Sequence, residues 1–364
     1  MKANSPSRIC LVPRLDGIGG MVSFQRRLAD GLRARRVQVC YDLRHTPYSA
    51  VLVIGGTRHL VDLWRVRRNG IPVVQRLDGM NWLHRLPRRR GSSAGLRHFL
   101  RAEYGNALLS FIRSRLAMGI IYQSEFARFW WETGRGTASV PCRVIYNGVD
   151  LKLYTPEGPQ YRPDQRWRVL VVEGSLMGGY EQGLEVAVRL VERLSGQAGL
   201  VNRSSLPREV ELAVVGHVPP EVRARWSAEG AGDTRSQAVQ IRWMGLLPPE
   251  NIPEMDRSAH LLYSVDINAA CPNSVIEALA CGLPVLAFDT GAMAEIVTHQ
   301  SGRVVPYGAN PWKLEPPDMD GLVNGALDLL QNQDAFRMGA RERAESAFGL
   351  DAMTDRYLEV LTGL

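Results

Sequence analysis

One glutamate, Glu277, follows the expected start of a helix by a single turn. The helix begins at Asn273 or Ser274, either of which is a good N-cap, after a loop that contains a proline. Free backbone N–H groups and the positive end of the helix dipole attract phosphate at such a start. A carboxylate one turn further on accepts hydrogen bonds from sugar hydroxyls, as in dinucleotide folds. The spacing predicts a site for a nucleoside diphosphate, and an ordinary strand–helix–strand unit with a surface glutamate is the alternative.

The elements around this helix alternate between strand and helix. Short apolar runs at 260–265 and 283–288 are typical of buried strands, and the helix over 274–281 lies between them. Gly282 and Pro284 mark the end of that helix. The order of strand and helix therefore predicts that the loop before Glu277 lies at the end of a buried strand.

Two loops in the first half of the chain also follow apolar strands. The strand over 8–13 leads into a glycine-rich loop that ends in Gly19 and Gly20 and opens a helix, so the backbone is free to approach a ligand. Many α/β proteins begin in this way, and the full dinucleotide fingerprint is missing. The strand over 72–75 leads into Asp78, at a place where open α/β sheets bind ligands. Asp78 is predicted to be a hydrogen-bonding group or base, and a plain Asp-Gly turn is the alternative.

Length and composition indicate a globular chain of two domains. The chain has 364 residues, and 45% of them are hydrophobic. No run of about 20 apolar residues predicts a membrane span, and the first residues lack the apolar core of a signal peptide. The five cysteines show no metal-binding spacing, so we expect reduced thiols in a cytoplasmic protein.

Charge is distributed unevenly along the chain. Residues 1–150 carry 25 Lys and Arg against 9 Asp and Glu, a net charge of +16, and the remaining residues carry −9. This asymmetry predicts an anionic partner that meets the first half only. An anionic membrane surface, a phosphate-bearing lipid acceptor and nucleic acid all fit that description.

A basic amphipathic segment lies within this positive half. Apolar residues recur at helical spacing over 99–118, and Arg97, Arg101, Arg113 and Arg115 lie among them. The preceding stretch, 84–98, reads as a basic loop that includes Arg88, Arg89 and Arg90. Such a helix usually packs its apolar face on a sheet, and contact with an anionic membrane is the alternative.

Residues 272–297 resemble the signature region of the family 4 glycosyltransferases, which have the GT-B fold. The matching residues are Glu277, Gly282, Pro284, Gly291 and Glu295. The resemblance extends to the glycine-rich loop near the start of the chain and to the Asn-Gly-Val-Asp at 147–150. It implies a retaining enzyme that moves a sugar from a nucleotide sugar to an acceptor. No cofactor or metal is implied, because helix dipoles and backbone N–H groups can stabilise the leaving diphosphate.

The resemblance also assigns roles to individual residues. It implies that residues from both halves of the chain bind the donor. Asp78 is the candidate catalytic residue. The implied donor-binding residues are Gly19, Gly20, Gly174, Ser175, Asn273, Ser274, Val275 and Glu277.

Three positions depart from the family pattern. The first signature glutamate, which reaches the donor sugar in the family, is Ala269 here. Family members place an Arg and a Lys against the diphosphate where this chain has Ser175 and Glu181. Three consequences are possible. Arginines of the first domain, such as Arg14 or Arg76, supply the positive charge; the donor carries less phosphate charge; or the protein no longer transfers sugar. Backbone N–H groups of Gly178 and Gly179 would also hold phosphate.

We therefore expect an α/β protein of the GT-B class, with two Rossmann-like domains whose parallel sheets face a central cleft. The first domain comprises residues 1–152 and binds the acceptor, and a C-terminal helix over 349–364 crosses back to it. The second domain comprises 153–348 and binds the nucleotide-sugar donor. The expected acceptor is a glycan or lipid-linked molecule of the cell envelope, the expected location is the cytoplasm or the inner face of the membrane, and no nucleic acid is expected. A degenerate protein that binds a nucleotide or a partner without catalysis is the alternative.

Overall fold

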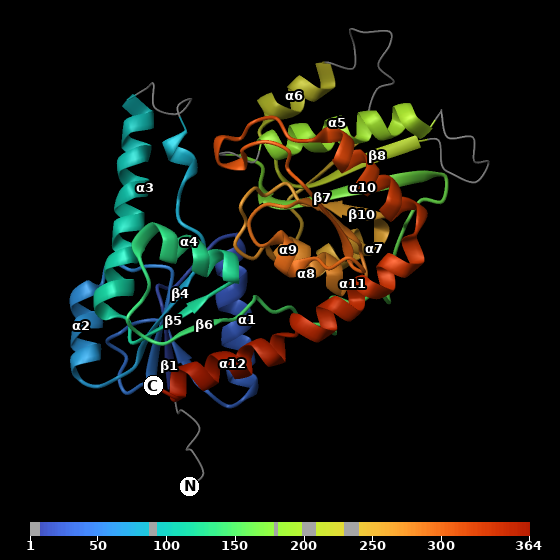
Figure 1. Cartoon of the computed structure of the whole chain (residues 1–364). Helices are drawn as coiled ribbons and strands as arrows, with labels where there is room; N and C mark the ends of the chain where they lie inside the picture. Colours follow the sequence, from blue (N-terminus) through green and yellow to red (C-terminus); the bar gives the residue numbers. More distant parts are fainter. Residues whose placement is uncertain (1–7, 87–92, 178–180, 199–208, 229–239) are drawn as a thin grey trace. The chain divides into compact units, whose positions relative to one another are not determined.

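The computed structural model describes residues 8–86, 93–177, 181–198, 209–228 and 240–364 (Figure 1). The chain divides into two compact units. Unit 1 comprises Met1–Gly148 and Phe348–Leu364, and unit 2 comprises Val149–Ala347. The polar stretch 87–92, which includes Arg88, Arg89 and Arg90, lies outside the described residues, as do Gly178 and Gly179.

Unit 1 is built on a six-stranded parallel sheet with the order β2-β1-β3-β4-β5-β6. Its central strands are short and apolar, and β3 is buried at every position, as expected for a parallel sheet covered on both faces. The strands are β1 (Arg8–Val12), β2 (Gln38–Cys40), β3 (Ala50–Ile54), β4 (Val73–Leu77), β5 (Gly119–Tyr122) and β6 (Cys142–Val144).

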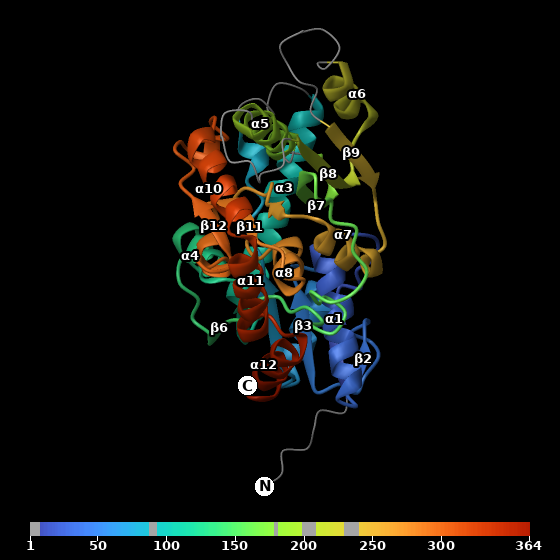
Figure 2. The ribbon, with the colours of Figure 1, turned by 90° about the vertical axis from the view of Figure 1, so that its right-hand side faces the viewer.

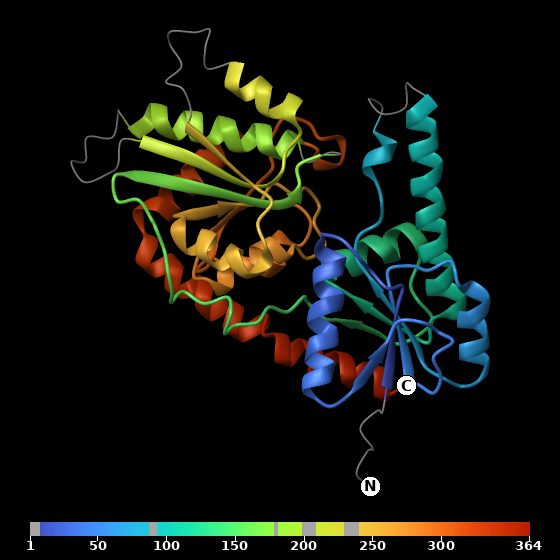
Figure 3. The same cartoon turned by 180° about the vertical axis from the view of Figure 1, so that it is seen from behind.

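Helices cover both faces of this sheet. On one face α1 (Gly20–Ala34) packs against α12 (Leu350–Thr362), which belongs to unit 1 although it ends the chain (Figure 3). Gly31 lets the two helices approach closely, because a Cβ there would come within 2.4 Å of Thr354 Oγ1. On the other face α2 (Leu60–Arg68) packs near the π-helical turn Ile112–Leu116. The sequence predicts a helix that starts at 55–57 and runs through Val66, but α2 begins only at Leu60. Gly55 has a φ of +68°, which a right-handed helix does not admit.

The basic helix of unit 1, α3 (Ser93–Phe111), extends beyond the sheet in Figures 1 and 3. Its apolar side chains are largely exposed: Leu96 59%, Leu100 60%, Tyr104 54% and Phe111 46%. Arg97 and Arg101 are also exposed. Arg113, which the sequence placed with them, is instead buried, and it donates hydrogen bonds to Tyr122 Oη and to the carbonyl of Gly136. No helix in the described part of the chain is long and apolar enough to cross a membrane.

Unit 2 contains a second six-stranded parallel sheet, with the order β12-β11-β10-β7-β8-β9. Two of its strands, β10 and β11, lie within the apolar runs expected at 260–265 and 283–288. The strands are β7 (Arg166–Ser175), β8 (Glu209–His217), β9 (Gln240–Gly245), β10 (Leu261–Tyr263), β11 (Val285–Phe288) and β12 (Gly302–Val305).

The helices of unit 2 lie on both sides of this sheet (Figures 1 and 2). Apolar residues of α5 (Glu181–Ala198) and α10 (Met319–Gln331) form one core with β7, β8 and β10. On the other side α8 (Asn273–Ala280) contacts α7 (Ile252–Ser258) and α11 (Gln333–Ala347). The short helices α6 (Pro220–Ala228) and α9 (Met293–Ile296) complete the unit, and α4 (Glu125–Arg135) completes unit 1.

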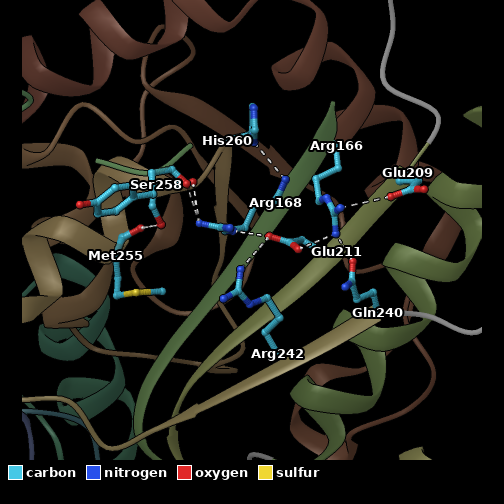
Figure 4. Close-up of polar contacts among 10 residues, drawn as sticks. Arg166, Arg168, Glu209, Glu211, Gln240, Arg242, Met255, Ser258 and His260 are labelled. Carbon is cyan, nitrogen blue, oxygen red and sulfur yellow. Dashed lines mark hydrogen bonds and ion pairs between the residues drawn. The ribbon is translucent and has the colours of Figure 1, made fainter. Parts of the chain in front are cut away.

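A cluster of ion pairs joins β7 and β8 near their amino ends (Figure 4). Glu211 is buried and accepts from the guanidinium groups of Arg168 and Arg166. Arg168 also donates to the carbonyl of Ser258, and its backbone N–H donates to Nδ1 of His260 at 2.9 Å. Burial, together with neighbouring arginines, lowers the pKa of His260 to about 3, which keeps the imidazole neutral and able to accept that bond. These ion pairs join the two strands at the end of the sheet opposite Ser175, the last residue of β7.

Candidate functional site

The chain order of the strands in unit 2 reverses at one point. From β7 the chain moves to β8 and β9 on one side, and then returns to β10 on the other side of β7. In open α/β sheets the crevice beyond the carboxyl ends of the strands at such a point is where ligands bind. The loops after β7 and β10 therefore define the candidate site. Gly174 and Ser175 end β7, and the loop after β10 leads into α8.

Helix α8 places Glu277 one turn from this crevice. The helix begins at Asn273, and Pro272 rather than Asn273 or Ser274 occupies the N-cap position, without a side-chain cap. Ser274 and Val275 follow in its first turn, where backbone N–H groups have no partner within the helix. Glu277 is largely buried. At the other end Gly282 has a φ of +66°, and Leu283 N–H donates to the carbonyl of Ala278, so the helix ends at the glycine as predicted.

The loop that contains Ala269 is held close to the turn after β11. Ala292 N–H donates to the carbonyl of Ala269 at 2.8 Å. A Cβ on Gly291 would lie 2.4 Å from that carbonyl oxygen, and Gly291 has a φ of +62°, so only glycine fits. The side chain of Ala269 is itself buried. The backbone at Ala269 is therefore held in place, and its methyl side chain offers no hydrogen bond to a ligand.

Three carboxyl groups interact electrostatically at this edge of the sheet. Glu173 lies near the end of β7, Asp266 follows β10, and Glu277 lies on α8. Burial, reinforced by the charges of Asp266 and Glu277, raises the pKa of Glu173 well above its ordinary value. Glu173 therefore keeps its proton over a pH range in which an ordinary glutamate is ionised.

Ser175 and Glu181, where the resemblance led us to expect departures from the family pattern, are both exposed. Ser175 is the last residue of β7, and Glu181 is the first residue of α5. The start of α5 is held against the carboxyl end of β10, because a Cβ on Gly183 would lie 2.4 Å from the carbonyl oxygen of Val265. Glu181 is thus brought to the same edge of the sheet as Ser175.

Unit 1 has a corresponding reversal between β1 and β3. The glycine-rich loop after β1 ends in Gly19, which caps α1, and in Gly20, its first residue. Gly17 and Gly19 have φ values of +96° and +143°, and no atom lies within 4 Å of where a Cβ would stand. Backbone conformation rather than crowding requires glycine here, and the space beside the loop is open to a ligand.

Asp78 follows β4 in the same sheet, beside a fully buried arginine. Burial raises the pKa of Asp78, and the positive charge of Arg76 opposes that rise. Arg76 Cζ lies 3.6 Å from the centroid of the Phe24 ring, and Arg76 Nη2 donates to Asn147 Oδ1 at 2.8 Å. Arg76 therefore lies inside unit 1, and the expectation that it presents its charge to a ligand is not supported. Arg14 is exposed and pairs with Asp16.

The loop after Asp78 is anchored to α3 by polar residues that the sequence did not single out. Asn106 Oδ1 accepts from Asn81 N–H, and Asn106 Nδ2 donates to Asn81 O, both at 2.9 Å. Glu103 contacts Arg85 and the buried His84, and these contacts lower the pKa of Glu103 to about 2. The sequence signal for this contact is a pair of polar residues, Glu103 and Asn106, that lie three positions apart on an otherwise apolar face of the helix.

No metal site accompanies these groups in the described ranges. Among residues 8–86, 93–177, 181–198, 209–228 and 240–364, no three His, Cys, Asp or Glu side chains are placed to hold one ion.

Two doubly wound units, each with a point of strand reversal in its parallel sheet, have the GT-B fold, as do the solved structures that they resemble. This confirms the fold class expected from the sequence. Residues 168–332 match the family described as Glycosyl transferases group 1. The match lies within unit 2 and includes Gly174, Ser175 and the whole of α8.

Solved structures of similar proteins cover almost the whole chain. Sucrose-phosphate synthase from Thermosynechococcus elongatus is 16% identical, with a TM-score of 0.68, and the likeness covers 97% of this chain and 98% of that one. HepE from Anabaena, solved in complex with UDP and glucose, is 16% identical, with a TM-score of 0.65, and covers 98% of this chain and 100% of its own. At these identities the likeness defines the fold alone.

Curated relatives match over a shorter stretch. A D-inositol 3-phosphate glycosyltransferase from Jonesia denitrificans is 26% identical over 215 residues, which are 56% of this chain and 47% of the relative. An alpha-maltose-1-phosphate synthase from Mycolicibacterium smegmatis is 23% identical over 221 residues, which are 60% of this chain and 55% of the relative. The chain thus spans about half the length of the curated relatives it matches.

Proposed function

We propose that this protein is a retaining, metal-independent glycosyltransferase of the family 4 type. Unit 2 binds a nucleotide-sugar donor, and unit 1 binds the acceptor, a glycan or lipid-linked molecule of the cell envelope. Gly19, Gly20, Gly174, Ser175, Asn273, Ser274, Val275 and Glu277 are the proposed donor-binding residues, and Asp78 is the proposed catalytic residue. Residues 1–152 with 349–364, and 153–348, are the proposed functional domains.

One observation carries this proposal. At the strand reversal of unit 2, the start of α8 opens onto the crevice, with Glu277 one turn inside the helix. Free N–H groups at the helix start suit a diphosphate, and the carboxylate suits ribose hydroxyls. The match of residues 168–332 to the group 1 glycosyl transferases supports the same assignment. HepE was also solved with UDP-glucose, a donor of the proposed class.

The donor site must stabilise the negative charge of a diphosphate without the two cations that Ser175 and Glu181 replace. Glu173 contributes to this stabilisation. Its raised pKa favours the protonated form, which bears no negative charge and has an O–H that can donate a hydrogen bond to phosphate. The N–H groups in the first turn of α8 supply further donors. We infer that the donor site holds phosphate by hydrogen bonds and dipoles in place of two charged side chains.

Replacing Glu277 by alanine tests the donor assignment. A hydrogen bond to a charged partner contributes about 1.5–3 kcal/mol, so the variant is expected to bind nucleoside diphosphate about tenfold or more weakly. Isothermal titration calorimetry with UDP, GDP and ADP measures this. Glu342→Ala, at an exposed position of α11, is the matched control and should bind as the wild type does. Undiminished affinity in a folded Glu277→Ala protein would remove Glu277 from the site.

A degenerate protein that binds a nucleotide without transfer is the second candidate. The buried Ala269 favours it, because the residue that reaches the donor sugar in the family is missing there. The two candidates agree on nucleotide binding and differ in turnover. Release of nucleoside diphosphate from a nucleotide sugar, measured against a protein-free control, separates them.

Attachment to the inner face of a membrane is a further part of the proposal, and the exposed stripe of α3 favours it. Leu96, Leu100, Tyr104 and Phe111 form an apolar stripe that is flanked by Arg97 and Arg101. Apolar side chains beside cations are typical of helices that lie in the interface of an anionic membrane.

Replacing Leu100 by glutamate is expected to lower binding to phosphatidylglycerol vesicles about tenfold, because it removes apolar contact and adds a repelled charge. Flotation at low and high salt measures the binding, which should weaken as salt rises. Phe129→Glu is the control, since Phe129 is an equally exposed apolar residue on α4, outside the stripe. Equal binding to neutral and anionic vesicles would argue against charge-dependent attachment to an anionic membrane, and a preference for DNA would favour nucleic acid as the partner.

A further inference from the structure

A basic groove of about 1160 Å³ borders β2, the edge strand of unit 1. Its lining includes five arginines, namely Arg8, Arg14, Arg33, Arg36 and Arg44. Among the described residues of that lining, Asp42 is the only acidic one. Three of these arginines form ion pairs: Arg14 with Asp16, Arg33 with Asp30, and Arg44 with Asp42. Arg8 and Arg36 pair with no carboxylate of the described residues, so the lining keeps a net positive charge that favours an anion.

The cations lie at both ends of the strand. At the amino end Arg8 is paired in register with Gln38, and Arg8 Nη2 donates to Gln38 Oε1 at 2.8 Å. At the carboxyl end Tyr41 gathers two arginines: Arg33 Nη2 donates to Tyr41 Oη at 3.3 Å, and Arg14 Cζ lies 5.7 Å from the ring centroid. Tyr41 follows the last residue of β2 and is three positions from Gln38, a span of about 10 Å. The groove therefore fits an extended anion better than a single small ion.

Arg36 adds an independent observation. It follows the C-cap of α1 with a φ of +62°, in the left-handed region that favours glycine. Arg36 N–H donates to Arg33 O, and Val37 N–H donates to Leu32 O, so the backbone needs this conformation. The side chain of Arg36 is exposed and makes no hydrogen bond or ion pair with the described residues. A side chain kept where glycine is more stable, and unused by the fold, indicates a role in binding.

This groove lies apart from Asp78, although Arg14 in its lining belongs to the loop that ends in Gly19. Asp78 follows β4, whereas the groove borders β2, and β1 and β3 lie between these strands. Three strand spacings amount to about 14 Å. The inference does not depend on the proposed sugar transfer.

We propose that the groove along β2 binds an extended anion that carries several phosphate groups. Guanidinium groups bind phosphate through two parallel hydrogen bonds, and each phosphate brings more charge than a carboxylate. An acidic peptide that added a strand to the edge would gain little from backbone pairing, because β2 is only three residues long, and its carboxylates carry less charge per group than phosphates. The groove therefore recognises its ligand through the negative charge of phosphate groups.

The Arg36→Gly variant separates binding from folding, because the two effects have opposite signs. Tripolyphosphate is the probe, titrated into the full chain at low salt in a calorimeter. The variant is expected to bind it about fivefold to tenfold more weakly, since one charge-assisted contact is lost. Its midpoint of thermal unfolding is expected to rise by about 1–4 °C, because glycine relieves the left-handed strain. Arg143→Ala removes an exposed arginine from β6, the opposite edge strand, and should leave the affinity within twofold.

Further arms identify the source of the phosphate. If phosphatidylglycerol vesicles displace tripolyphosphate, the groove takes lipid headgroups, and if they do not, it takes a soluble phosphate; either result supports the proposal. Tighter binding of polyglutamate than of tripolyphosphate would overturn it. Unchanged affinity of Arg36→Gly, an equal loss in Arg143→Ala, or a lowered unfolding midpoint in Arg36→Gly would overturn it as well.

Discussion

The Asp78→Asn variant is expected to transfer sugar at least about 100-fold more slowly than the wild type. A carboxylate that orients or deprotonates a reacting hydroxyl contributes about 10²–10⁴ in rate, and asparagine keeps the shape but loses the basicity. Initial rates of nucleoside diphosphate release, with saturating donor, measure the loss. Because burial raises the pKa of Asp78, the carboxylate is lost as the pH falls through a value above its ordinary one. The acid limb of the wild-type rate profile should therefore lie above the ordinary pKa of an aspartate.

The Asp30→Asn variant provides the control for Asp78. Asp30 is an exposed residue of α1 that pairs with Arg33 on the helix surface, so its loss should leave the rate within about twofold. If Asp78→Asn, folded and able to bind nucleotide, keeps most of the wild-type rate, Asp78 is only the first residue of a turn.

The Glu211→Ala variant is expected to lower the free energy of unfolding of unit 2 by about 3–5 kcal/mol. Removing one partner of a buried ion pair leaves the other charge without compensation. Arg168 is almost fully buried between β7 and β8, and Glu211 is the carboxylate that it pairs with (Figure 4). Urea denaturation, followed by the fluorescence of the tryptophans in unit 2, measures the change.

Glu209→Ala is the matched control for Glu211, from the same strand and the same cluster. Glu209 is exposed, and its carboxylate lies 3.7 Å from Arg166 Nη2. An exposed pair of this kind contributes about 0–1 kcal/mol. Equal destabilisation by the two substitutions would mean that burial of the Arg168–Glu211 pair does not set its contribution.

The sequence predicted the strands of both sheets well, because fully buried parallel strands read as short apolar runs. The run at 285–288 and the glycine that ends α8 are found as expected. Helix starts were less predictable. The expected N-cap at Asn273 or Ser274 falls on Pro272, and the start of α2 is delayed by the left-handed Gly55. Backbone conformation at a turn depends on tertiary contacts that periodicity does not record.

Side-chain roles in the candidate site were predictable only where a backbone motif fixes them. The position of Glu277 was predictable from its distance to the helix start, and that of Gly291 from the turn that contains it. The burial of Arg76 and Arg113 was not predictable, because the aromatic and carbonyl groups that receive them come from distant parts of the chain, such as Phe24 and Gly136. The raised pKa of Glu173 likewise depends on Asp266 and Glu277, which only the fold brings near it.

Turnover of nucleotide sugars tests the central claim most directly. The wild-type protein is incubated with UDP-, GDP-, ADP- and dTDP-sugars, and release of the nucleoside diphosphate is followed by chromatography. The account predicts release from at least one donor at ten times the protein-free rate or more, with loss of that activity in Asp78→Asn and weaker donor binding in Glu277→Ala. A folded wild-type protein that neither binds nor turns over any of these donors would contradict it.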